Sequence, residues 1–150
     1  PYPQRRARRS NDRINNDSKR TQTRGEHHAG FTVPDLAATR AFFVDGLGFD
    51  VVGEKPDYPA VFLSDGGTMM TLWQAEDPAT AVGFDRRANV GLHHVAFTAP
   101  DLELVLERLT RWPGVEIEFE PETLGGGPTR HLMCAIPGGI RVEFIAPAAS

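Results

Sequence analysis

The sequence contains an internal repeat, and this repeat constrains the fold more than any other feature. Residues 26–36 read EHHAGFTVPDL and residues 92–102 read LHHVAFTAPDL, so that seven of eleven positions are identical. A second match aligns residues 64–73 with residues 136–145. Two copies are too few to stack into a solenoid. The sequence therefore predicts one module of about 50 residues that is used twice in a pseudo-twofold domain.

Both copies predict the same order of secondary structure. Each begins with an alternating strand that ends at Pro-Asp, where proline stops the strand and aspartate can cap a helix. An amphipathic segment follows, and then three strands, of which the last two are joined by a Gly-Gly turn. The fold class is therefore α+β, with two βαβββ modules. The strands are expected at 27–33, 49–54, 60–64 and 68–74 in the first copy and at 93–99, 115–120, 129–136 and 140–145 in the second.

Charge divides the chain into a tail and a domain. Residues 1–25 carry eight Arg and Lys against two Asp and have almost no apolar side chains, which predicts a disordered basic tail. Such a tail suits either a nucleic-acid-binding arm or a solvated extension. We favour the solvated extension and expect no nucleic-acid partner. The domain is expected at 26–147, with module one at 26–74, a linker at 75–91 and module two at 92–147.

Hydropathy and cysteine content predict a soluble cytoplasmic protein. The longest apolar runs are only a few residues, against roughly 20 for a transmembrane helix, so we expect no membrane partner. The single cysteine, Cys134, excludes an internal disulfide and a zinc site built from several cysteines.

Strand parity places a set of metal-ligating side chains on one face. Neighbouring side chains of a strand alternate between its two faces, so His28 and His94 lie opposite the apolar residues of their strands. Thr71 and Glu143 take the same face on the last strand of each module. Two imidazoles and one carboxylate can bind Fe(II), Mn(II), Zn(II) or Ni(II) and leave positions open for a substrate. His28, His94 and Glu143 are therefore the candidate metal ligands, and the histidine before each of the two is expected to have a structural role.

Three segments carry a resemblance to a known family: HAGFTVPDLAATRAFF, HVAFTAPDLELVLERL and PGGIRVEFIAP. They resemble the vicinal oxygen chelate superfamily, which groups glyoxalase I, methylmalonyl-CoA epimerase, ring-cleaving extradiol dioxygenases, and fosfomycin and bleomycin resistance proteins. The resemblance covers residues 26–147. It implies that each module forms a curved half-barrel sheet around a shared cavity. It also implies metal ligands at His28, at the position of Thr71, at His94 and at Glu143.

Two positions depart from the patterns of particular family members. Thr71 stands where glyoxalase I and the epimerase have Glu or Gln. Met133 stands where the dioxygenases keep a tyrosine, ten residues before the last ligand. Bleomycin-type binding proteins lack the metal ligands, whereas this chain keeps three of them.

Other side chains of the same face are expected to contact a substrate or to move protons. His131 can act as a general acid or base near Glu143. Arg141 can hold an anionic group of the substrate, or instead a neighbouring carboxylate such as Glu116 or Glu118. The catalytic candidates are thus Glu143 and His131, and the substrate-binding candidates are Thr71, Trp73, Met69, Arg141 and Met133.

The sequence as a whole predicts a metal-dependent, glyoxalase-like lyase or isomerase. Such an enzyme would use a divalent ion (Fe, Zn, Mn or Ni) to chelate a small substrate through neighbouring oxygens and to stabilise an enolate-type intermediate. One alternative is an Fe(II)-dependent extradiol-type dioxygenase. Another is a metal-free, ligand-sequestering protein like those that confer bleomycin resistance. The two modules can pair within one chain or across a homodimer, and the sequence leaves both arrangements open.

Overall fold

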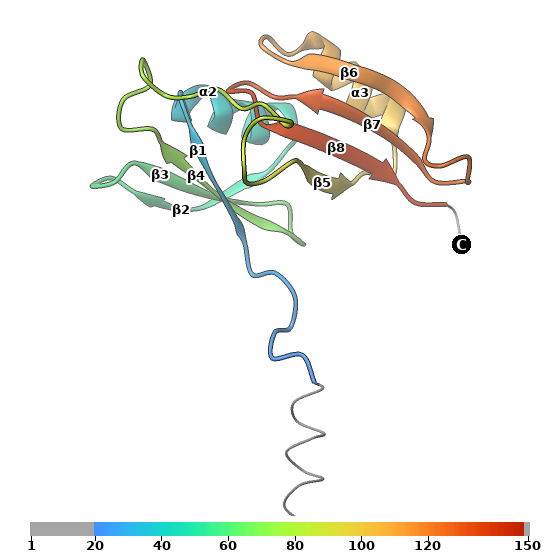
Figure 1. Ribbon diagram of the computed structural model, residues 1–150, viewed down its shortest axis with the longest axis horizontal. Helices are drawn as coiled ribbons and strands as arrows, with labels where there is room; N and C mark the ends of the chain where they lie inside the picture. Colours follow the sequence, from blue (N-terminus) through green and yellow to red (C-terminus); the bar gives the residue numbers. More distant parts are fainter. Residues whose placement is uncertain (1–19, 149–150) are drawn as a thin grey trace, which may run out of the picture.

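Each repeat folds as its own βαβββ module in the computed structural model, which describes residues 20–148 (Figure 1). Residues 1–19 of the predicted basic tail lie outside the described residues. Module one contains β1 (Ala29–Val33), α2 (Leu36–Ala41), the π-helix η1 (Phe42–Gly46), β2 (Asp50–Lys55), β3 (Ala60–Ser64) and β4 (Met69–Gln74). Module two contains β5 (Val95–Thr98), α3 (Leu102–Arg111), β6 (Glu116–Thr123), β7 (Arg130–Ala135) and β8 (Arg141–Ala146).

In each module the first and last strands lie side by side in a four-stranded mixed sheet. The strand order is β1-β4-β3-β2 in one sheet and β5-β8-β7-β6 in the other. β1 pairs with β4, and β5 with β8, in parallel, while the other pairs are antiparallel. The register places Gly30 beside Thr71 and Ala96 beside Glu143. The predicted α+β fold with two βαβββ modules is confirmed.

The first strand of each module begins two residues later than the sequence predicts. β1 starts at Ala29, which pairs with Met70, and β5 starts at Val95, which pairs with Val142. The parallel partner of each strand begins only at Met69 or at Arg141. The histidine pairs of the two repeats therefore precede the paired strands and are not held by the sheets.

Aspartate side chains begin both helices, as the Pro-Asp motif predicts. The Asp35 carboxylate accepts a hydrogen bond of 3.0 Å from the backbone N–H of Ala38. The Asp101 carboxylate accepts one of 3.0 Å from the backbone N–H of Leu104. Each bond satisfies a backbone donor that the first helical turn leaves without a partner.

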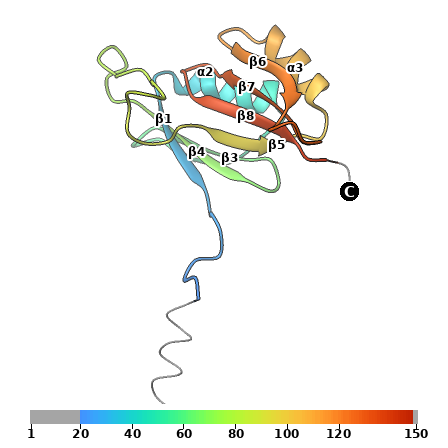
Figure 2. The same cartoon turned by 45° about the vertical axis from the view of Figure 1, so that its right-hand side comes forward.

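The helical segment of module one packs against module two. The Thr39 hydroxyl donates to the carbonyl of Pro137 at 3.3 Å. The rings of Phe42 and Trp112 lie 6.0 Å apart between centroids, and those of Phe43 and Phe97 lie 6.3 Å apart. One apolar core therefore spans both modules. In both views the α2 segment lies between its own sheet and module two (Figures 1 and 2).

Candidate functional site

Module two brings three of the predicted site residues together. Glu143 on β8 and His131 on β7 are 9% and 8% exposed, although both are ionisable. The Nδ1 of His131 lies 3.0 Å from Oε2 of Glu143 and donates to it, because a carboxylate only accepts. The Nε2 of His94 faces the other carboxylate oxygen, Oε1, at 4.0 Å. The two oxygens of Glu143 thus have different neighbours, and only Oε1 faces His94.

Residues of β6 contact the His131 ring on the side away from Glu143. The ring of Phe119 lies 4.9 Å from the His131 ring, centroid to centroid. The Nε2 of His131 lies 3.7 Å from Oε1 of Glu122, which is half exposed at 59%. Met133, 3% exposed, pairs in register with Glu143, so it lies beside the carboxylate on the same face of the sheet.

A chain of polar contacts leads away from His94. The Nδ1 of His94 is 2.8 Å from Nδ1 of His93. The Nδ1 of His93 is in turn 3.2 Å from Nη1 of Arg141. Arg141 also donates to both carboxylate oxygens of Glu118, at 2.8 and 3.1 Å. Of the two alternatives for Arg141, the structure therefore shows the pairing with a neighbouring carboxylate, and that carboxylate is Glu118. Partial loss of solvent, and then the charge of Arg141, lower the pKa of His93 below its usual range.

Module one presents a different set of side chains on its first and last strands. The indole Nε1 of Trp73 donates to the hydroxyl of Thr71 at 2.9 Å, and Thr71 is buried. A Cβ atom at Gly30 would lie only 2.9 Å from the Thr71 hydroxyl. Glycine at this position therefore makes space for the side chain of Thr71. Met69 is partly buried at the start of β4. This face therefore carries no carboxylate at the position equivalent to Glu143.

An aromatic cluster around Trp73 was not predicted. The Tyr58 ring lies 4.9 Å and the Phe62 ring 6.2 Å from the Trp73 ring, and the Lys55 ammonium lies 5.9 Å from its centroid. Strand parity could have found Phe62, because it alternates with the buried Val61 and Leu63. Tyr58 lies in the turn before β3, where no periodic signal exists.

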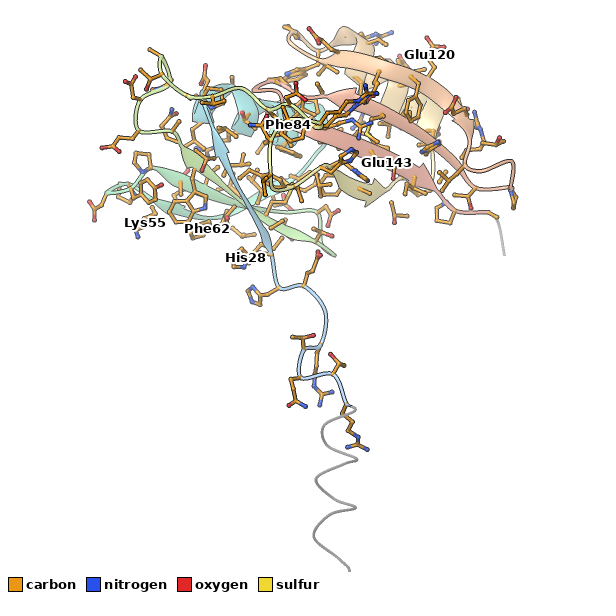
Figure 3. The ribbon with its side chains drawn as sticks, in the orientation of Figure 1. His28, Lys55, Phe62, Phe84, Glu120 and Glu143 are labelled. Carbon is orange, nitrogen blue, oxygen red and sulfur yellow. The ribbon has the colours of Figure 1, made fainter. Side chains whose placement is uncertain are left out.

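The structure does not bring His28 to the other two candidate ligands of the same chain. His28 is exposed, and its Nδ1 lies 3.0 Å from Nδ1 of His27. In Figure 3 it lies where the chain enters β1, well away from Glu143. Among residues 20–148, no group of three or more His, Cys, Asp or Glu side chains is arranged to hold a metal ion.

Two cavities adjoin the residues around His94. One, of about 490 Å³, lies between β1, the segment 82–92 and the start of β5, and His93, His94 and Arg141 line it. Another, of about 380 Å³, lies between Phe84 and β6, and it shares Phe84 and Arg141 with the first. The segment 82–92 therefore covers part of the polar face of module two.

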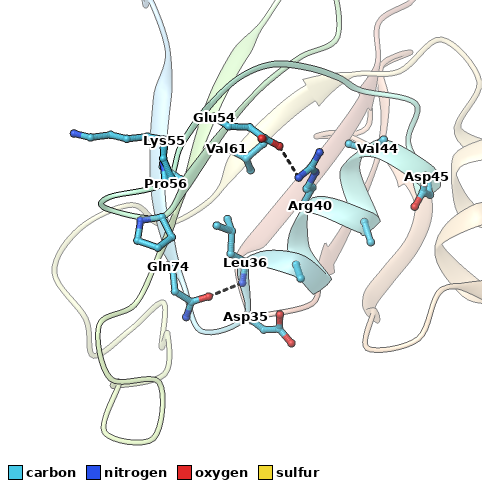
Figure 4. Close-up of a pocket in the computed structure, with 14 residues that line it drawn as sticks. Asp35, Leu36, Arg40, Val44, Asp45, Glu54, Lys55, Pro56, Val61 and Gln74 are labelled. Carbon is cyan, nitrogen blue, oxygen red and sulfur yellow. Dashed lines mark hydrogen bonds and ion pairs between the residues drawn. The ribbon is translucent and has the colours of Figure 1, made fainter.

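A larger cavity, of about 750 Å³, lies between α2 and the β2–β3 hairpin (Figure 4). Leu36, Val44 and Val61 contribute apolar walls, and Arg40 and Glu54 form an ion pair of 2.7 Å at its rim. None of the predicted site residues lines it. Among the described residues, no helix is long and apolar enough to cross a membrane.

Comparisons with known proteins agree with this architecture. Residues 25–144 match the glyoxalase/bleomycin resistance protein/dioxygenase superfamily. The chain belongs to this superfamily.

One characterised relative and several solved structures are similar to the chain. A 2-epi-5-epi-valiolone epimerase from Actinomyces sp. is 30% identical over 141 residues, covering 79% of this chain and 77% of the relative. A glyoxylase/bleomycin resistance protein/dioxygenase domain from Frankia sp. EAN1pec has a TM-score of 0.71 at 22% identity, covering 83% of this chain and 92% of that one. The fosfomycin resistance protein FosX from Listeria monocytogenes has a TM-score of 0.65 at 18% identity, covering 86% and 96%. The two structures support the fold alone.

Proposed function

We propose that this protein is a metal-dependent isomerase of the glyoxalase type that epimerises a small carbonyl compound with two neighbouring oxygens. The observation that carries the proposal is the buried Glu143–His131 pair, with Oε1 of Glu143 facing Nε2 of His94. A buried carboxylate with one oxygen turned toward a cavity side chain suits the removal and return of a proton. The similarity to an epimerase favours epimerisation over the lyase reaction.

The donor atoms of module two fit a divalent ion. The Nε2 of His94 and Oε1 of Glu143 are 4.0 Å apart, so a small side-chain rotation would bring them to the roughly 3.3–3.8 Å that separates two tetrahedral ligands of one ion at about 2.0–2.3 Å. Imidazole and carboxylate suit Zn, Fe, Mn and Ni. A bound ion of this kind would act as a Lewis acid on the substrate's neighbouring oxygens and stabilise the enolate-type charge.

We propose that His28 of a second copy supplies the third ligand, so that the site forms in a homodimer. His28 is exposed and lies apart from Glu143 of its own chain (Figure 3). The segment that lines the 490 Å³ cavity also exposes large apolar side chains, Val82 at 85%, Val90 at 105% and Leu92 at 52%. Apolar side chains clustered beside a cavity are typical of interaction surfaces.

In this site the residues of the chain have separate tasks. Glu143 would release the ion through Oε1 and take the proton from the carbon next to the carbonyl, while His131 holds that carboxylate in place through Oε2. A water molecule would return a proton to the opposite face of the enolate, which completes the epimerisation. Met133 keeps an apolar side chain beside the carboxylate. From the second copy, Thr71, Trp73 and Met69 would form the wall against which the substrate packs.

Hydrogen–deuterium exchange tests the proposal. The protein, purified without chelator and analysed for metal, is incubated in D₂O with 2-epi-5-epi-valiolone and related hydroxyketones. NMR measures the incorporation of deuterium at the carbon next to the carbonyl. We expect this incorporation to depend on the metal and to be lost in Glu143→Gln. No exchange with any of the four metals would overturn the proposal, and oxygen uptake with catechols would identify a dioxygenase instead.

One observation favours the sequestering alternative. The aromatic cluster of Trp73, Tyr58 and Phe62 offers a stacking surface that needs no metal, and Tyr58 is 51% exposed. Ligand affinity that is unchanged by metal removal and by Glu143→Gln would support this function over the enzyme.

A further inference from the structure

We infer that His93 and Arg141 are positioning residues that fix the tautomer of His94, so that its lone pair is on Nε2, the atom that faces Glu143. The inference rests on the proposed function only where it treats His94 as a metal ligand. The tautomer itself follows from hydrogen-bond donors and acceptors in module two.

The argument begins with Arg141, because a guanidinium group only donates. Its Nη1 lies 3.2 Å from Nδ1 of His93, so this nitrogen of His93 is an acceptor and carries no proton. The Nδ1 of His94 lies 2.8 Å from the same nitrogen, where a second lone pair would be repelled, so Nδ1 of His94 is a donor and shares the single lone pair of His93 with Arg141. The proton of a neutral His94 is thus on Nδ1, which leaves the lone pair on Nε2.

The guanidinium group of Arg141 is held in the orientation in which Nη1 donates to His93. Its Nε and Nη2 donate to the two oxygens of Glu118, at 2.8 and 3.1 Å, which leaves Nη1 for His93. The side chain of Arg141 is 13% exposed. A planar guanidinium bound to a carboxylate at two points has little rotational freedom. Arg86, from the segment between the modules, also pairs with Glu118 but has no hydrogen bond to His93.

Module one repeats the histidine contact without the arginine. The Nδ1 atoms of His27 and His28 are 3.0 Å apart, as in module two. The position equivalent to Arg141 is Met69, since residues 64–73 align with residues 136–145. Within the described residues, His27 has no arginine partner. The arginine contact is therefore specific to module two, which also holds Glu143.

Fixing the tautomer has a consequence for metal binding. A metal ligand must present a lone pair, and partners of the other ring nitrogen typically change metal affinity by 10–100-fold. Arg141→Met, which copies module one, should weaken Zn²⁺ or Co²⁺ binding by the reciprocal of the fraction of His94 that keeps its proton on Nδ1, about two- to tenfold for a mixture of tautomers. Arg86→Met removes a guanidinium from the same carboxylate but not from His93, so it should leave the affinity nearly unchanged.

The test measures the tautomer directly in the metal-free protein. Two-dimensional ¹⁵N NMR of the imidazole rings, at about pH 8 where neutral imidazoles predominate, should show a proton on Nδ1 of His94. Arg141→Met and His93→Phe should give a mixture of tautomers, while His93→Asn, whose amide oxygen can accept from His94, should restore the single form. Calorimetric titration with Zn²⁺ should rank the variants in the same order.

A proton on Nε2 of His94 in the unmodified protein would overturn the inference, whether or not any variant folds. It would also be overturned if Arg141→Met left both the tautomer and the Zn²⁺ affinity unchanged. Failure of the proposed function is a separate result, because absence of deuterium exchange leaves the tautomer readout intact.

Discussion

The two modules share one frame but carry different chemistry. Both have an aspartate-capped helix and a histidine pair before the first strand. Where module two has Arg141, Glu143 and His131, module one has Met69, Thr71 and Ala60 at equivalent register positions. Module one has an aromatic cluster around Trp73 instead. The two modules thus have the same frame, while the carboxylate and His131 lie in module two alone.

The helical segments differ for a structural reason. In module two, α3 is one helix of ten residues that ends at Arg111. In module one, α2 has six residues and continues as the π-helix η1, whose Phe42 reaches Trp112 at the end of α3. The segment therefore packs against module two as well as its own sheet. The large cavity beside β2 lies on the side of α2 that this packing leaves open (Figure 4).

The largest expected effect is a difference in exchange rate between variants of Glu143 and of Thr71, its equivalent in module one. Glu143→Gln should lower the rate of deuterium exchange by about 10²–10⁴-fold, because the base is lost. Thr71→Val removes only the acceptor of the Trp73 hydrogen bond and should cost less than about tenfold. Both variants should remain folded, since Val142 and Leu72 provide the buried packing on the opposite faces of the strands. Equal losses in rate would contradict the division of chemistry between the modules.

The next prediction concerns the core that joins the modules. Phe43 is 1% exposed and contacts Phe49 of its own module and Phe97 of the other. Phe43→Ala should lower the free energy of unfolding by about 3–5 kcal/mol, as for other large buried aromatics. Urea denaturation followed by tryptophan fluorescence and by circular dichroism should give one coincident transition. Two separate transitions would show that the modules unfold independently.

The smallest effects should be equal in the two modules. Asp35→Ala and Asp101→Ala each remove a single capping hydrogen bond and should each cost about 1 kcal/mol of unfolding free energy. Chemical denaturation at constant ionic strength measures both values. A difference between the two variants larger than about 1 kcal/mol would show that the repeated Pro-Asp motif does not start the two helices equivalently.

Local features of the sequence predicted most of the fold. The repeat, the Pro-Asp caps and the alternation of the strands depend on neighbouring residues, and the structure agrees with them. The choice of Glu118 over Glu116 as the partner of Arg141 depends on a β-bulge between Ile117 and Phe119, which no pattern in the sequence reveals. The separation of His28 from Glu143 depends on how the modules pack, which is a long-range property.

The central claim is that one site is built from module two of one copy and module one of another. Mixing two inactive variants, His28→Ala and Glu143→Gln, tests it directly after subunit exchange in mild denaturant and dilution. In a mixed dimer, His28 from one chain meets His94 and Glu143 from the other, so one of the two sites is intact. Random exchange makes half the dimers mixed, and we predict recovery of about a quarter of the unmodified activity. No recovery, with mixed dimers verified by mass spectrometry, would contradict the account.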